Sequence, residues 1–231
     1  MIARNPTAAF RRRLPKVERP QMSILTAEQS ARLLQGIAHT TVYWPTLLAL
    51  GLGLRRGEVL AVRWRSVDFA RGTLSVTGSL EQIGHVLRFK PTKSGKPRSV
   101  TMPQFVIDEL RLRKREQAET LLALGVRQTG DTLVCCRQDG EPLQPQLLTR
   151  EFQRLRDRLT DLPKVRFHDL RHSHAVQLLE EGVHIKSVQE RFGHATAAFT
   201  LDRYGQATKT MQQEAAELID AAFRRAGKSE T

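Results

Sequence analysis

Apolar side chains recur at every third or fourth position in several parts of the chain, which is the pattern of helices with one buried face. The first such stretch is 27–37, where Thr26 and Gln29 have the spacing of a capping box at a helix start. A second helix is expected over 42–52 and a third from Arg56 onward. The later helices are expected from Pro103 onward and over 146–159, 169–181, 185–191 and 206–225.

The period changes to two between the third and fourth predicted helices. Residues 73–77 alternate as a half-buried strand does, and 85–89 and 98–102 are predicted as two further strands. The segment 90–97 is rich in Lys, Gly and Pro and is predicted to be a basic hairpin loop. These three strands are expected to form one small antiparallel sheet. The predicted fold class is therefore α+β, mostly helical, with a three-stranded sheet.

The charge balance narrows the choice of partner. The 231 residues, enough for one large domain, contain 37 Lys and Arg against 24 Asp and Glu, a net charge of +13. Such an excess favours a polyanion such as nucleic acid, the alternative being a basic surface without a partner. Residues 1–20 are proline-punctuated and basic, and they are expected to be an extended arm that follows a DNA backbone or a disordered tail.

The two cysteines, Cys135 and Cys136, are adjacent, and adjacent cysteines rarely form a disulfide. They end a predicted short buried strand over 133–136, and no further metal ligands lie nearby, so no metal site is expected. No stretch approaches the roughly 20 apolar residues of a membrane span, and no apolar signal core follows the basic N-terminus. The sequence therefore predicts a cytoplasmic protein with no membrane contact.

His168 and Arg171 are candidates for binding an anion. They stand three residues apart at the expected start of a helix, so they share a face near the positive end of the helix dipole. The alternative is an unrelated histidine and arginine on the surface.

Arg55 lies between Gly53 and Gly57, just before an apolar helix, and such a backbone can present a guanidinium into a cleft. Glu58 could hold an arginine by a charged hydrogen bond and fix its orientation. From the residues alone, Arg55 and Arg56 are equal candidates for this position.

Other candidates lie on the 90–97 loop and near the C-terminus. A lysine on the loop can reach a phosphate, but Lys90, Lys93 and Lys96 compete for that role. The chain has two tyrosines. Tyr43 stands in an apolar run and is expected in the core, whereas Tyr204 stands in a polar, glycine-ended segment that could deliver a hydroxyl or simply pack an aromatic ring.

Taken together, residues 21–210 resemble the tyrosine recombinases, the family of phage and mobile-element integrases. The order and spacing of the motifs carry the resemblance. They are LGLRRGE at 52–58, TKSGKPRSV at 92–100, HDLRHS at 168–173, FGH at 192–194, and the segment around Tyr204.

The resemblance implies site-specific DNA recombination with no metal or cofactor. Strands would be cut and rejoined through a 3′-phosphotyrosyl intermediate. The residues that match the family's catalytic pattern are Arg55, Lys93, His168, Arg171, His194 and the nucleophile Tyr204, with Glu58 in support. Phe192 stands where the family commonly has leucine, which we expect to change packing only.

The same resemblance implies an organisation. Residues 1–20 would be an interdomain linker and 21–231 the catalytic domain, with the N-terminal core-binding domain absent. The expected partners are double-stranded DNA and an excision or host accessory factor. The chain is expected to form a homotetramer on DNA and to be a monomer in isolation. The expected DNA contacts are Arg11, Arg12, Arg13, Lys90 and Lys96.

Three questions stay open at this point. A topoisomerase-like nicking and closing activity, or a catalytically silent DNA-binding regulator, would use similar features. The helix over 206–225 could pack on its own domain or on a neighbouring subunit.

Overall fold

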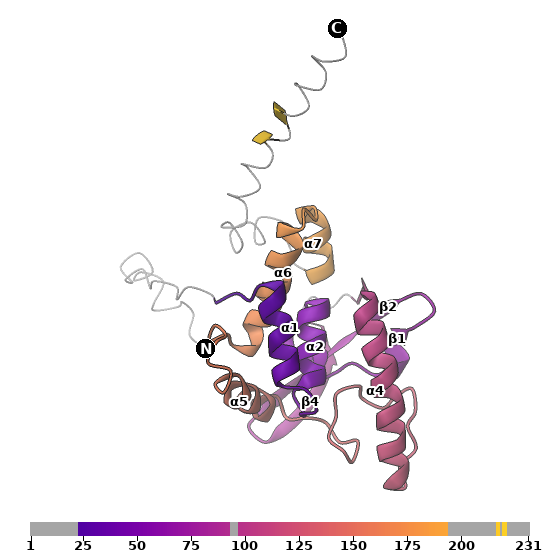
Figure 1. Cartoon of the computed structure of the whole chain (residues 1–231). Coiled ribbons are helices and arrows are strands. Elements are labelled where there is room, and N and C mark those ends of the chain that lie inside the picture. The colour runs from indigo at the N-terminus through magenta and orange to yellow at the C-terminus, as the bar shows by residue number, and fades with distance from the viewer. Residues whose placement is uncertain (1–22, 93–96, 194–215, 218, 221–231) are drawn as a thin grey trace, which may run out of the picture.

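The computed structural model describes residues 23–92, 97–193, 216–217 and 219–220 (Figure 1). The predicted helices that fall in this part of the chain are confirmed, with small shifts at their ends. None of them is long and apolar enough to cross a bilayer. The helices are α1 (Ala27–Gly36), α2 (Tyr43–Leu52), α3 (Arg56–Val59), α4 (Gln104–Ala123), α5 (Pro145–Arg156), α6 (Phe167–Glu180) and α7 (Ile185–Phe192).

The start of α1 has the predicted capping box. The backbone N–H of Thr26 donates to Gln29 Oε1 at 3.0 Å, and the backbone N–H of Gln29 donates to Thr26 Oγ1 at 3.2 Å. Two N–H groups that the first turn leaves unpaired are thereby satisfied.

A three-stranded antiparallel sheet is present, which confirms the fold class, but its strands are not the predicted set. Its order is β1 (Val67–Asp68), β2 (Thr73–Val76) and β5 (Arg98–Thr101). The predicted strand over 85–89 corresponds to β4 (Val86–Pro91), which pairs instead with β3 (Gly78–Ile83) in a separate two-stranded hairpin.

The reason for this difference is a tight turn that was not among the predicted elements. Ile83 pairs with Val86, so Gly84 and His85 form a two-residue hairpin, and Gly84 has φ +59°. The register of this hairpin continues as far as Pro91, so the chain over 90–97 begins inside a strand. In the described residues β4 does not pair with β5.

The predicted strand over 133–136 was wrong in one respect. The segment is buried, as expected, but it makes only isolated bridges, from Leu133 to Arg63 and from Cys136 to Pro142. Residues 133–136 are therefore an extended segment held by single β-bridges, and not a strand of a regular sheet.

The core is built around α2, which has few polar side chains and is buried from Pro45 to Leu52. Helices α1 and α6 pack against it, and Figure 1 shows α4 and α5 on opposite flanks. A smaller apolar cluster joins α6 to α7 through Leu179, Val188 and Phe192. The C-terminal ends of α2 and α7 both lie against α6, and this junction positions the candidate site.

Candidate active site

The site begins where α2 gives way to α3. Gly53 has the left-handed φ of +67°, and a Cβ there would lie 2.7 Å from Cδ2 of His174. A Cβ on Gly57 would lie 2.6 Å from the carbonyl oxygen of Leu80. Since neither position has room for a side chain, the two glycines fix the short piece of backbone that carries Arg55.

Glu58 lies in the first turn of α3, and only 2% of its side chain is exposed. Its carboxylate accepts the backbone N–H of Arg55 at 3.0 Å and Nη1 of Arg55 at 2.9 Å. The expected hydrogen bond between Glu58 and a neighbouring arginine is therefore present. Arg56 turns away and donates from Nη1 to Thr149 Oγ1 at 2.6 Å, so Arg55 is the one that faces Glu58.

Arg98, at the start of β5, also binds Glu58. Its Nη1 and Nη2 donate to Oε1 and Oε2 of Glu58 at 3.0 and 2.7 Å, and its Nε donates to the carbonyl of Arg191 at 3.0 Å. Arg98 was not among the predicted site residues. The available signal was the strand alternation, because Arg98 shares the inward face of β5 with the buried Val100, and an inward arginine requires a buried acid.

Arg171 is buried, with 3% of its side chain exposed. Its guanidinium donates to the carbonyl of Gly53 and, at 2.6 Å, to the carbonyl of Phe192, and it lies 4.3 Å from the centre of the Phe192 ring. Nη1 lies 3.9 Å from Oε2 of Glu58. Arg171 therefore ties α6 to the ends of α2 and α7 and joins the cluster around Glu58.

His168 lies in the first turn of α6, one turn before Arg171, and is exposed. Its ring stands edge-on to that of His172, with 4.8 Å between centroids. Asp169 in the same turn accepts the backbone N–H of Arg166 at 2.8 Å. The helix start is thus capped from within the chain, and His168 remains at the surface.

The cluster around Glu58 keeps its carboxylate ionised. Burial alone raises the pKa of this carboxyl, but the hydrogen bonds and charge of Arg98, followed by those of Arg55, lower the pKa to about 2. Three guanidinium groups against one carboxylate leave two net positive charges. A partly buried site of this charge favours an anion.

His174 lies beside this cluster but is not an acid–base candidate. Burial, and then the charge of Arg191, lower its pKa to about 3. Its Nε2 accepts from Nε of Arg191 at 3.0 Å, so the neutral ring has its proton on Nδ1. Its ring stacks on Phe192 at 5.7 Å, which supports the end of α7.

Several predicted site residues lie outside the described part of the chain, and their roles stay predictions. Gly193, the last described residue before one of them, lies against the cluster, since a Cβ there would be 3.2 Å from Cδ of Arg98. The residues concerned are Lys93, Lys96, His194, Tyr204, Arg11, Arg12 and Arg13.

The prediction that Lys90 lies on a loop is wrong. It lies in β4, opposite Ser79, because the β3–β4 register extends to Pro91. Its ammonium forms an ion pair with Glu81 on the same hairpin. Its predicted contact with DNA is untested.

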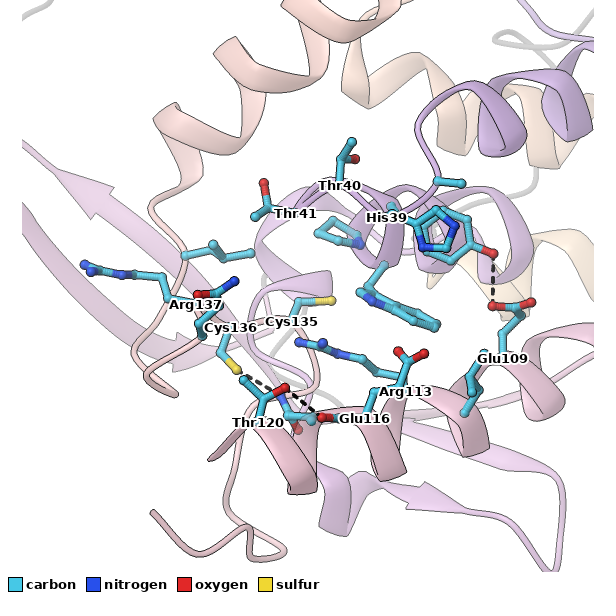
Figure 2. Close-up of a pocket in the computed structure, with 18 residues that line it drawn as sticks. His39, Thr40, Thr41, Glu109, Arg113, Glu116, Thr120, Cys135, Cys136 and Arg137 are labelled. Atoms are coloured by element: carbon cyan, nitrogen blue, oxygen red, sulfur yellow. Dashed lines mark hydrogen bonds between the residues drawn. The ribbon is translucent and has the colours of Figure 1, made fainter. Parts of the chain in front are cut away.

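A separate pocket of about 530 Å³ lies between the α1–α2 connection, α4 and residues 135–138, and Figure 2 shows Arg113 pointing into it. Its lining includes none of the predicted site residues. Tyr43 is partly buried there and donates from its hydroxyl to Glu109 at 2.9 Å, and burial raises the pKa of this phenol. Tyr43 is therefore poorly suited to act as a nucleophile.

Cys135 and Cys136 are free and buried. Burial raises the pKa of Cys135 to about 12 and also raises that of Cys136, so about one Cys135 thiol in ten thousand is ionised at pH 8. We expect DTNB to label the native protein at least about 100-fold more slowly than protein unfolded in guanidinium, which should release two equivalents. Two rapid equivalents from native protein would contradict this burial.

The described fold is similar to that of DNA-bound recombinases. A structure of the Tn1549 transposon integrase in complex with transposon right end DNA superimposes with a TM-score of 0.73 at 21% identity, covering 93% of this chain and 73% of that one. The chain therefore has the mostly helical fold of that integrase, with the motif arginines gathered at one junction.

The model of the phage integrase family matches residues 23–211, and the chain belongs to this family. It is 28% identical over 224 residues to the ICEBs1 integrase of Bacillus subtilis, covering 95% of this chain and 60% of that protein. It is 30% identical over 213 residues to the tyrosine recombinase XerA of Pyrococcus furiosus, covering 90% and 66%. The chain thus spans about two thirds or less of the length of these relatives.

Proposed function

We propose that the chain cuts and rejoins DNA at specific sites, as an integrase of a mobile element, with Tyr204 as nucleophile. The observation that carries the proposal is the cluster in which Glu58 holds Arg55 and lies 3.9 Å from Arg171. These arginines come from two motifs more than a hundred residues apart. Family membership and the DNA complex of the Tn1549 integrase support the same function.

In the proposed reaction, the phenol oxygen of Tyr204 attacks the scissile phosphorus and the bond to the 5′-oxygen breaks. His168 takes the phenol proton, and Lys93 protonates the departing 5′-oxygen. A base is needed for the phenol proton because a free tyrosine has a pKa near 10, so little of it is ionised at neutral pH. A second 5′-hydroxyl then attacks the 3′-phosphotyrosyl bond, and tyrosine leaves. The bond energy stays in the intermediate, so no nucleotide is consumed.

Arg55, Arg171 and His194 are proposed to bind the non-bridging phosphate oxygens, whose negative charge grows in the transition state. Of the two arginines, Arg55 is the more accessible, with 31% of its side chain exposed. The net positive cluster also lowers the free energy of forming a phenolate nearby.

The partner proposed for this reaction is double-stranded DNA, bound by a homotetramer. An excision or host factor would set its direction. The proposed backbone contacts are Arg11, Arg12, Arg13, Lys90 and Lys96.

The test uses nicked duplexes taken from the DNA that flanks the gene, in buffer with EDTA. The proposal predicts a covalent adduct that survives SDS and appears with only some duplexes. Relaxation of supercoiled plasmid without site preference would indicate a topoisomerase-like activity instead. Binding without an adduct would indicate a silent regulator, and cleavage that requires magnesium would overturn the mechanism.

DNA affinity is expected to fall steeply with salt, because the proposed contacts are mostly to phosphates. For about six such contacts, affinity should fall about a thousandfold between 50 and 200 mM salt. Fluorescence anisotropy with a labelled duplex measures this slope. A flat response would show that the basic surface does not bind the backbone.

A further inference from the structure

We infer that Arg98 is a positioning residue for DNA cleavage, which orients Arg55 through Glu58 and ties this pair to the end of α7. The inference rests on the proposed function. Arg98 does not match any catalytic position in the family resemblance, and only 12% of its side chain is exposed. Its importance follows from its contacts.

The first step is the saturation of the Glu58 carboxylate. Oε1 accepts from Nη1 of both Arg55 and Arg98, and Oε2 accepts from Nη2 of Arg98 and the backbone N–H of Arg55. An ionised carboxylate has about four acceptor sites, and here all four are used. Arg98 supplies two of them in a fork, so it sets the plane in which Glu58 meets Arg55.

The second step is the link to α7. Nε of Arg98 donates to the carbonyl of Arg191, in the last turn of that helix, while its two Nη groups hold Glu58 on α3. One side chain therefore fixes the distance between α3 and the residue pair Phe192–Gly193. The predicted phosphate ligand His194 is the next residue in sequence.

Charged side chains from three elements face Glu58. Arg55 faces it from the start of α3, Arg98 from β5 and Arg171 from α6. The elements packed most extensively against α3 are β3 and α2. Helix α2 contains no charged side chain, and Glu81 of β3 is paired with Lys90. The response of Glu58 to pH therefore depends on its burial and, among these groups, on Arg98 first and Arg55 second.

Removing Arg98 changes this response in a definite direction. Arg98→Gln deletes the two charged hydrogen bonds that contribute most to lowering the pKa of Glu58, so this pKa rises from its wild-type position. The adduct rate should fall about tenfold or more at pH 7, because a misplaced arginine stabilises the transition state poorly. The rate should fall further toward pH 5, where a protonated Glu58 no longer holds Arg55.

The experiment measures adduct formation from pH 5 to 9 for the whole chain and four variants. Arg98→Gln should show the additional fall in adduct rate toward pH 5, and Arg98→Lys should recover part of the rate. Adding Glu58→Gln to Arg98→Gln should remove the new pH dependence. Arg154→Gln, which breaks only the surface pair with Glu151, should behave as wild type.

A second readout does not depend on activity. In wild type the lowered pKa of Glu58 makes its contribution to stability present above about pH 4.5. In Arg98→Gln the pKa of Glu58 is lowered less, so urea unfolding should show the acidic loss of stability beginning at a higher pH than in wild type. Arg154→Gln should lack this trend.

The outcomes separate the two proposals. If wild type forms an adduct and Arg98→Gln matches it in rate and pH profile, the positioning role is overturned and the proposed function stands. A slower rate with an unchanged pH profile also overturns it, since it would indicate only a structural role. If wild type forms no adduct, the proposed function fails, and the positioning of a catalytic arginine fails with it.

Discussion

Replacing Tyr204 by phenylalanine should abolish the covalent DNA adduct, with a loss of at least about a thousandfold in rate. The phenol oxygen is the atom proposed to bond to phosphorus, and phenylalanine lacks only that oxygen. DNA affinity and its salt dependence should be unchanged, because the basic contacts remain. The measurement is the fraction of labelled strand retained with protein on a denaturing gel.

The chain offers a matched control, since its only other tyrosine is Tyr43. Tyr43→Phe loses a hydrogen bond to Glu109 but leaves the proposed site untouched, so adduct formation should be at the wild-type level. An adduct that persists in Tyr204→Phe, or one that disappears in Tyr43→Phe, would assign the nucleophile elsewhere.

Glu58→Gln should have the second largest effect, because it acts on both stability and activity. The change leaves Arg55 and Arg98 facing an amide in place of a buried carboxylate, and breaking such a pair costs about 3–5 kcal/mol. Adduct formation should fall about a hundredfold, because Arg55 loses the group that orients it. Urea unfolding and single-turnover cleavage measure the two effects.

The pH dependence of the stability lost in Glu58→Gln provides a further check. The pKa of Glu58 is lowered to about 2, so its stabilising contribution is present above about pH 4.5 and is lost as pH falls toward 2. The stability difference between wild type and Glu58→Gln should therefore shrink in acid. Glu151→Gln breaks a surface pair with Arg154 and should cost less than about 1 kcal/mol. Equal losses of stability in Glu58→Gln and Glu151→Gln would contradict the central role of Glu58.

The sequence predicted those features that depend on near neighbours in the chain. The capping box at Thr26 and Gln29 spans three residues, so composition and spacing are enough to find it. The hydrogen bond from an arginine to Glu58 is equally local, but spacing left Arg55 and Arg56 as equal candidates, and only the family resemblance selected Arg55. The helix boundaries follow from the same local periodicity.

The features that were missed depend on contacts between distant segments. The pairing of β2 with β5 and the fork of Arg98 on Glu58 join residues that are 22 to 40 positions apart. Alternation identifies a strand but not its partner, and a two-residue turn at Gly84 redirected the pairing. Arg171 was expected to face a phosphate, and its donation to the carbonyls of Gly53 and Phe192 could not be predicted before the ends of α2, α6 and α7 were placed.

The most direct test of the central claim is a crystal structure of Tyr204→Phe bound to a duplex that wild type cleaves. The account predicts that Arg55 and Arg171 both donate to one phosphate, with Glu58 still holding Arg55 and Arg98. A scissile phosphate bound away from Arg55, with Arg171 donating to the carbonyls of Gly53 and Phe192 and not to the phosphate, would contradict it.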